Sequence, residues 1–296
     1  MNWQGVFPAF TTPFREDLSI DEGLIPRHLE AMLAAGVKGF VALGSLGESA
    51  TLSFDEKVRV LELSARALRG RAPLVAGIAS LSTEEAVSLA RRARQAGAEG
   101  LMVLPPYVYR GDDRETLAHF SAVIEATPLP CMLYNNPIAY GTDVRPEQIA
   151  DLARRHPNLA AVKESSADVR RLAAIRALIG DRLALFVGVD DLIVEGIAAG
   201  AVGWIAGLVN ALPEESVRLF DLARAGKHAE ADALYRWFLP LLRLDVVPKF
   251  VQLIKLTQEV AGLGSERVRP PRLPIAGAER EAVLAMIRER LANRPR

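Results

Sequence analysis

Several residue types are scarce in this 296-residue sequence, and each scarcity narrows the range of possible functions. There is one cysteine, Cys131, so the chain can form neither an internal disulfide nor a site built from several thiolates. Cys131 stands in the apolar segment PCMLY, which is typical of an inert core thiol. The four histidines are scattered and make no ligand pair at a strand end, so we predict no metal site.

The sequence also has no excess of charge of either sign and no long apolar run. Lysine plus arginine equal aspartate plus glutamate at 36 each, and no basic run points to a nucleic-acid partner. No apolar stretch approaches the ~20 residues that cross a bilayer. The first residues, MNWQGVFPAF, lack the features of a signal peptide. We therefore expect a cytoplasmic protein that binds neither nucleic acid nor membrane.

Short apolar runs alternate with helical patterns along most of the chain. The runs expected to form strands cover residues 5–10, 38–43, 73–78, 99–104, 130–134, 159–163, 183–188 and 201–207. Strands that are apolar on both faces and separated by helices indicate a parallel sheet covered by helices. Eight such units predict an α/β fold, the (β/α)8 TIM barrel. A doubly wound open sheet is less favoured, because TTPFREDLS after the first run is not a glycine-rich dinucleotide turn.

Some helical patterns begin with a recognisable capping sequence, and helical patterns continue in the chain after the last expected strand. Capping boxes are predicted at Ser53 with Glu56 and at Ser82 with Glu85. After about residue 226 only helical patterns remain. We therefore divide the chain into a barrel over 1–226 and a three-helix extension over 227–296, packed on the barrel and without chemistry of its own.

Lys163 ends the buried run LAAVK, and lysine is rare in this chain. There are six lysines against thirty arginines, so arginine is the ordinary cation here. A desolvated lysine can lose its proton and attack a carbonyl, whereas arginine stays protonated. Lowering a lysine pKa from ~10.4 to ~7–8 takes about 4 kcal/mol, which burial in an apolar barrel can supply. The alternative is a lysine that snorkels from the strand end to solvent.

Other strand ends carry further candidates, because barrel chemistry lies where the strands end. The loop Gly44-Ser45-Leu46-Gly47 can turn its backbone N–H groups toward an anion, or it can be an ordinary turn. Tyr134 can move a proton in the barrel mouth, or it can simply be a buried tyrosine. Tyr107 and Tyr109 lie on a proline-stiffened loop that favours an interface. Asp190 and Asp191 are expected to cap the helix that follows them, or else to contact the substrate.

Taken together, these segments resemble the family of dihydrodipicolinate synthase and N-acetylneuraminate lyase, which are class I barrels that form Schiff bases. The resemblance rests on the order and spacing of GVFPAFTTPF, GSLGES, YNNP, VKES, GVDD and VRPPRLP, and it covers nearly the whole chain. It implies that Lys163 forms an imine with a 2-keto acid, that Tyr134 shuttles protons, and that Gly44, Ser45 and the Leu46 backbone hold the substrate carboxylate. It also implies a homotetramer built from tight dimers. The covalent imine takes the place of a cofactor, and none is expected.

Three departures from the synthase pattern bear on the reaction. The glycine loop of synthases carries two threonines, where this chain has Ser45 and Leu46. Val108 replaces the second of two paired tyrosines, so Tyr107 and Tyr109 remain only as possible relay or interface residues. Ala139 stands where synthases have an arginine for the second substrate, and a buried carboxylate without its cation loses roughly 2–5 kcal/mol. Ala139, Tyr140 and Gly203 occupy positions where family members contact the distal part of the substrate.

These departures favour a catabolic member of the family over the lysine-biosynthetic synthase. Our hypothesis is dehydration and deamination of 4-hydroxy-1-pyrroline-2-carboxylate or of a related 2-keto-3-deoxy acid through an imine at Lys163. Alternatives within the class are an aldolase that cleaves a 4-hydroxy-2-keto acid to pyruvate and an aldehyde, and 4-hydroxy-tetrahydrodipicolinate synthase. The alternative from another class is a non-catalytic barrel that senses a keto acid.

Overall fold

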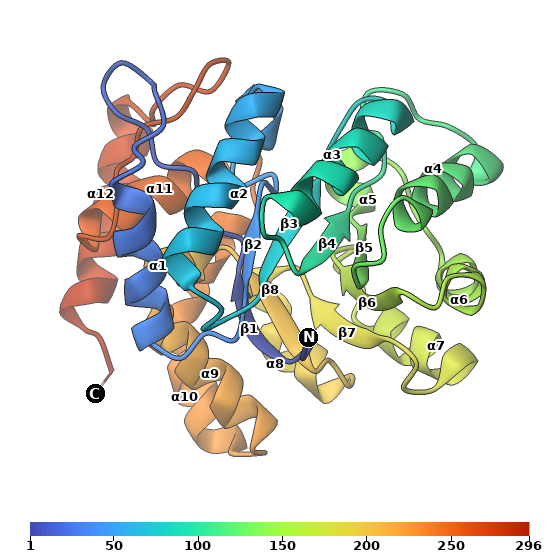
Figure 1. Cartoon of the computed structure of the whole chain (residues 1–296). Coiled ribbons are helices and arrows are strands. Elements are labelled where there is room, and N and C mark those ends of the chain that lie inside the picture. Colours follow the sequence, from blue (N-terminus) through green and yellow to red (C-terminus); the bar gives the residue numbers. More distant parts are fainter. Residues whose placement is uncertain (296) are drawn as a thin grey trace.

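A nearly closed barrel of parallel strands forms the centre of the computed structural model, which describes residues 1–295 (Figure 1). Within these residues there are eight strands: β1 (Gly5–Pro8), β2 (Phe40–Ala42), β3 (Leu74–Ile78), β4 (Gly100–Val103), β5 (Cys131–Asn135), β6 (Leu159–Glu164), β7 (Ala184–Val187) and β8 (Gly203–Ala206). Their order in the sheet is β1-β8-β7-β6-β5-β4-β3-β2, and every named pair is parallel. The predicted (β/α)8 TIM barrel is confirmed.

The remaining seam joins β1 to β2. Ala9 and Val41 form a parallel bridge there, and the Phe10 N–H donates to the Val41 carbonyl at 3.0 Å. Further back along the same seam, before β2 begins, the Lys38 N–H donates to the Val6 carbonyl at 2.9 Å. These bonds bring the first two strands together, so all eight carboxyl ends surround one mouth.

Helices follow the strands and cover the outside of the barrel (Figure 1). They are α1 (Leu24–Ala34), α2 (Phe54–Leu68), α3 (Thr83–Gln95), α4 (Asp113–Glu125), α5 (Pro137–Tyr140), α6 (Pro146–Arg155), α7 (Arg170–Ile179), α8 (Ile193–Ala198) and α9 (Pro213–Arg224). No helix among residues 1–295 is long and apolar enough to cross a membrane.

The chain ends in α10 (His228–Leu242), α11 (Phe250–Val260) and α12 (Gly277–Ala292), which lie at the side of the barrel where α1 and α9 run (Figure 1). A short 3-10 turn, η4 (Arg243–Asp245), joins α10 to α11. This extension sends two charged side chains toward the ends of the strands: Asp245 lies against Gly207 after β8, and Lys255 pairs with Glu48 after β2. Their contacts are described below. The predicted division into a barrel and an extension without chemistry of its own stays a prediction.

Of the two predicted capping boxes, one is complete. Ser53 Oγ accepts from the Glu56 N–H at 3.2 Å, and Glu56 Oε2 accepts from the Ser53 N–H at 2.9 Å. At α3, Ser82 Oγ accepts from the Glu85 N–H at 3.2 Å, but the reciprocal bond is not formed. The Glu85 carboxylate instead pairs with Lys57 of α2 at 3.4 Å. An ion pair between helices therefore replaces half of the second box.

An aromatic cluster fills the amino-terminal end of the barrel. The rings of Trp3, Phe7 and Phe186 lie with centroids 5.4–6.2 Å apart. Gly203, the first residue of β8, belongs to this region: a Cβ on it would lie 2.5 Å from Phe186 Cδ1. The missing side chain makes room for the Phe186 ring, which explains glycine at this position by packing.

Candidate active site

Lys163 is the fifth residue of β6 and points into the mouth of the barrel. Its partner in register on β5 is Tyr134, so the two side chains emerge from neighbouring strands at the same level. Lys163 is 6% exposed, and its Nζ lies 4.0 Å from the centre of the Tyr134 ring. The lysine is therefore held in the mouth rather than extended to solvent.

Glycine after β7 makes room for this lysine. A Cβ on Gly188 would lie 2.5 Å from Lys163 Cε and 2.7 Å from Lys163 Cγ. The aliphatic stem thus lies across the end of β7, shielded from water. Burial lowers the pKa of Lys163 below the usual value for a lysine, against the opposing influence of Tyr140, Asp245 and Asp190. A larger fraction of this amine is therefore free to act as a nucleophile near neutral pH.

Tyr134 and Tyr140 form the aromatic wall beside the lysine. Their rings meet edge to face with centroids 5.7 Å apart. The Tyr134 hydroxyl accepts a hydrogen bond from Asn136 Nδ2 at 3.0 Å. Burial raises the pKa of both phenols, so each keeps its proton at neutral pH and can donate it.

Tyr140 reaches the mouth because the expected turn after β5 is a short helix. Asn136 caps α5 by accepting from the Ala139 N–H at 3.0 Å, and Pro137 is its first residue. The Tyr140 hydroxyl then meets the hydroxyl of Ser45, which comes from the loop after β2. This contact brings the glycine loop and the tyrosine wall together.

The loop from Gly44 to Gly47 has the form of an anion site. Its ends are fixed by bonds from the Glu48 N–H to the Ser45 carbonyl at 3.1 Å and from the Ser49 N–H to the Gly44 carbonyl at 3.4 Å. Among residues 1–295, the N–H groups of Ser45 and Leu46 have no acceptor. Two free N–H groups beside a serine hydroxyl can bind a carboxylate. The Leu46 side chain is buried at 3% exposure, so only its backbone is available.

A buried acid behind the loop ties it to the C-terminal extension. Glu48 is fully buried, and its Oε1 pairs with Lys255 Nζ of α11 at 2.6 Å. Its Oε2 accepts from the Arg269 N–H at 3.0 Å. Lys255 also donates to the Arg267 carbonyl at 2.6 Å. Residues more than 200 positions away in the sequence therefore hold the loop from Gly44 to Gly47 (the anion loop) in place through Glu48.

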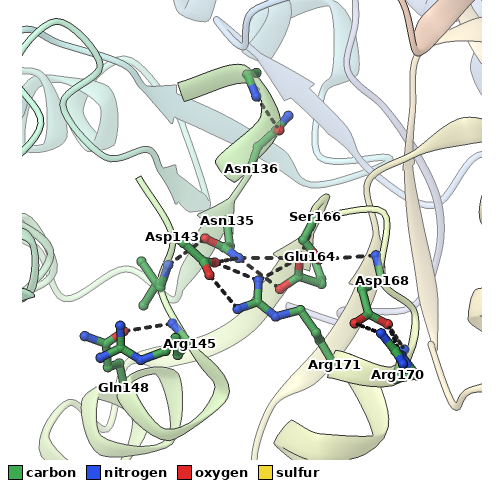
Figure 2. A network of polar contacts seen from close by, with 12 residues as sticks. Asn135, Asn136, Asp143, Arg145, Gln148, Glu164, Ser166, Asp168, Arg170 and Arg171 are labelled. Atoms are coloured by element: carbon green, nitrogen blue, oxygen red, sulfur yellow. Dashed lines mark hydrogen bonds and ion pairs between the residues drawn. The ribbon is translucent and has the colours of Figure 1, made fainter. Parts of the chain in front are cut away.

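Polar contacts also fix the ends of β5 and β6, which carry Tyr134 and Lys163 (Figure 2). Glu164 is buried and accepts from Asn135 Nδ2 at 3.1 Å and from the Ser166 N–H at 2.7 Å. Asn135 Nδ2 also donates to Asp143 at 3.2 Å, and Asp143 is paired with Arg171 at 2.7 Å. Burial raises the pKa of Glu164 despite these donors. The network holds the two strand ends in a fixed relation (Figure 2).

The other predicted candidates lie at different distances from this cluster. The Tyr107 ring approaches Tyr140, with centroids 5.9 Å apart, and so joins the aromatic wall. Tyr109 is 60% exposed and donates to Glu115 on α4, away from the lysine. Val108 and Ala139 are both exposed. Gly203 lies at the amino-terminal end of β8, so its contact with substrate stays a prediction that this position does not favour.

Asp190 does not cap the helix that follows it, contrary to our expectation. It is fully buried and accepts from Trp204 Nε1 at 2.9 Å, from the Gly207 N–H at 3.1 Å and from the Leu208 N–H at 2.8 Å. The N–H groups after β8 donate to this carboxylate, and η2 (Asp190–Leu192) has no side-chain cap. Asp190 thus links the ends of β7 and β8 through hydrogen bonds.

Sequence reasoning missed Gly188, Asp245 and the ion pair of Glu48 with Lys255. In the sequence Gly188 is only a glycine after an apolar run. Asp245 and the ion pair reach their positions only when the C-terminal extension docks on the barrel. No cluster of three or more potential metal ligands occurs among residues 1–295.

Comparisons with known proteins agree with this geometry. Residues 2–290 match the sequence model of the Dihydrodipicolinate synthetase family. A 4-hydroxy-tetrahydrodipicolinate synthase of Methanoculleus marisnigri is 33% identical over 294 residues, which cover 98% of this chain and 99% of that protein.

Two solved structures have the same fold over nearly their whole length. A putative dihydrodipicolinate synthetase from Pseudomonas aeruginosa superimposes with a TM-score of 0.92 at 31% identity, over 97% of this chain and 99% of that one. A prophage protein from E. coli K12, solved in complex with pyruvate, gives a TM-score of 0.92 at 26% identity, over 97% and 98%. The chain is therefore an enzyme of the class I, Schiff-base lyase type, and it belongs to the dihydrodipicolinate synthetase family.

Proposed function

We propose that this enzyme forms an imine between Lys163 and the keto carbon of a 2-keto acid or a cyclic imino acid. The observation that carries the proposal is the buried Lys163 amine, 4.0 Å from the ring centre of Tyr134 in the barrel mouth. A protonated imine withdraws electrons from the neighbouring carbon, so it stabilises the carbanion left when a bond there breaks. The complex of the E. coli K12 relative with pyruvate supports a small keto acid as ligand.

The remaining groups of the mouth supply what such a reaction needs. The free N–H groups of Ser45 and Leu46 bind the substrate carboxylate, which sets the keto carbon in front of the lysine. Tyr134 carries protons to and from the reacting carbon. The covalent imine serves in place of a cofactor, and no metal takes part.

For the net reaction we propose dehydration and deamination of 4-hydroxy-1-pyrroline-2-carboxylate or dehydration of a related 2-keto-3-deoxy acid. Lys163 takes over the imine, a proton leaves C3, and the hydroxyl at C4 departs as water. In the pyrroline the ring nitrogen stays on C5 as an amine, and the new C3=C4 double bond shifts to give a C5 imine whose hydrolysis releases ammonia. Hydrolysis of the Lys163 imine then releases a keto-acid semialdehyde. The support comes from Val108 and Ala139, which are exposed and uncharged where a synthase needs a tyrosine and an arginine.

A second candidate is 4-hydroxy-tetrahydrodipicolinate synthase, which is favoured by the names of the relatives. A protein with that name from Methanoculleus marisnigri is 33% identical across the chain. Cleavage of a 4-hydroxy-2-keto acid to pyruvate and an aldehyde would use the same imine and is the third reaction to assay.

A substrate panel with single-turnover detection distinguishes these reactions. We expect semialdehyde to form from 4-hydroxy-1-pyrroline-2-carboxylate or from a 2-keto-3-deoxy acid. Turnover only with pyruvate plus aspartate semialdehyde would contradict this assignment and identify a synthase. Release of pyruvate from a 4-hydroxy-2-keto acid would identify an aldolase.

Replacing Tyr134 with phenylalanine should separate proton transfer from imine formation. We expect Tyr134→Phe to lower kcat by about 10²–10⁴, the range for a general acid or base, because the proton carrier is lost. The edge-to-face ring contact with Tyr140 should remain. Steady-state kinetics measures the effect, with Tyr235→Phe, whose hydroxyl bonds to the Asp191 carbonyl, as the control. A kcat equal to that of the wild type would remove Tyr134 from the mechanism.

The expected homotetramer built from tight dimers is part of the same proposal. Val108, in the loop after β4, and Ile138, in the short helix α5, are 74% and 71% exposed. Apolar side chains this exposed are consistent with an interface between copies. Analytical ultracentrifugation measures the assembly directly.

A further inference from the structure

Asp245 is a carboxyl group of the C-terminal extension that lies at the mouth of the barrel. It closes η4, and its side chain lies against Gly207, the first residue after β8. A Cβ on Gly207 would be 2.6 Å from Asp245 Cγ and 3.1 Å from its Oδ2. Among residues 1–295 the Asp245 carboxyl has no hydrogen-bond donor and no ion-pair partner. Its neighbour Asp191, by contrast, lies 3.6 Å from Arg243.

Two glycines place this acid beside the reactive lysine. Gly188 follows β7 and contacts the Lys163 side chain, while Gly207 follows β8 and contacts Asp245. Because β7 and β8 are neighbours in the sheet, the amine and the carboxyl lie over adjacent strand ends. The negative charge of Asp245 opposes the lowering of the Lys163 pKa by burial.

Of the two carboxyls Asp190 and Asp245, we expect Asp245 to be the protonated one. Four titratable groups face Asp245 from other elements: Tyr134 on β5, Lys163 on β6, and Asp190 and Asp191 on η2 (Asp190–Leu192). Burial raises the pKa of Asp190 to about 6, although three N–H donors stabilise its ionised form. Asp245 has no such donor, and burial together with Asp190 raises its pKa well above the usual range. Donors favour the ionised form at Asp190 and none favours it at the half-buried Asp245, so Asp245 is the one of these two carboxyls that keeps its proton.

We propose that Asp245 is the general acid for imine formation at Lys163. The neutral amine adds to the keto carbon and gives a carbinolamine, in which C2 carries a hydroxyl and the lysine nitrogen. Asp245 donates its proton to that hydroxyl, the C–O bond breaks, and water leaves. The nitrogen lone pair forms the C=N bond, and the Asp245 carboxylate then faces the protonated imine. This inference rests on the proposed function and adds a residue from outside the barrel to its first step.

Pyruvate suffices as the probe, since only the first step is tested. The enzyme is mixed with pyruvate, samples are quenched with borohydride at intervals, and the reduced adduct is measured by intact mass. We expect Asp245→Asn to form the adduct about 10²-fold more slowly, because an amide cannot give up a proton. The final amount of adduct should match that of the wild type, which also shows that the variant is folded. Asp191→Asn is the matched control, with the same change of charge on a carboxyl that faces Arg243.

Two further measurements separate acid catalysis from a structural role. In the wild type the rate of adduct formation should fall as the pH rises and Asp245 loses its proton, and Asp245→Asn should lack this fall. Gly207→Ala adds a Cβ that pushes the Asp245 carboxyl away, so on its own it should slow adduct formation. Added to Asp245→Asn, it should cause no further slowing. Adduct formation by Asp245→Asn at the wild-type rate would overturn the inference. If the wild type forms no adduct at all, the proposed function fails, and this inference fails with it.

Discussion

Lys163→Arg is expected to abolish both the pyruvate adduct and the turnover of every 2-keto acid that the wild type accepts. Arginine keeps the positive charge and the long stem, but its guanidinium stays protonated and forms no imine. The loss should reach at least about 10³-fold, as expected when a covalent nucleophile is removed. Steady-state kinetics and intact mass measure the two effects.

Lys57→Arg is the matched control for this variant. Lys57 is another buried lysine, 5% exposed, and it pairs with Glu85 on the outside of the barrel. The control should keep wild-type kinetics, and both variants should keep the far-ultraviolet circular dichroism of the wild type. Activity of Lys163→Arg within tenfold of the wild type would show that the chemistry does not pass through this amine.

The second large effect concerns stability, at the buried pair of Glu48 and Lys255. Lys255→Met should lower the free energy of unfolding by about 3 kcal/mol, near the low end of the range for breaking a buried ion pair. The low end applies because Glu48 keeps the Arg269 N–H at 3.0 Å and Arg272 at 3.8 Å. The change also leaves the Arg267 carbonyl without its donor. Urea denaturation followed by circular dichroism measures the effect.

The same substitution at an exposed pair gives the control. Lys249 and Glu279 are about half exposed, so Lys249→Met should change stability by less than about 1 kcal/mol. Adding Glu48→Gln to Lys255→Met should recover part of the loss, because the uncompensated charge is removed. A Lys255→Met variant as stable as Lys249→Met would show that the pair does not anchor the extension to the anion loop.

The parts of the enzyme that follow a local pattern could be predicted from the sequence. Apolar runs that alternate with helices define the barrel, and the residues at their ends fall in the mouth. Lys163 and Tyr134 meet because parallel neighbours in register point their side chains the same way. Ser45 joins them through Tyr140 of α5, the short helix after β5.

What could not be predicted depends on contacts between distant segments. Asp190 precedes a helix, so a capping role was the natural expectation, but the N–H groups after β8 hold it instead. Lys255 reads as an ordinary helix residue until α11 docks beside Glu48. Asp245 and Arg243 both interrupt the otherwise apolar segment LLRLDVV, so the sequence gives only a weak signal for Asp245.

The most direct test of this account is borohydride reduction of the wild-type enzyme in the presence of pyruvate, followed by peptide mapping. We predict a single added mass of reduced pyruvate on the peptide that contains Lys163, and none on the peptide that contains Lys255. Enzyme that stays unmodified, or an adduct on a different lysine, would contradict the assignment of Lys163 as the imine-forming residue.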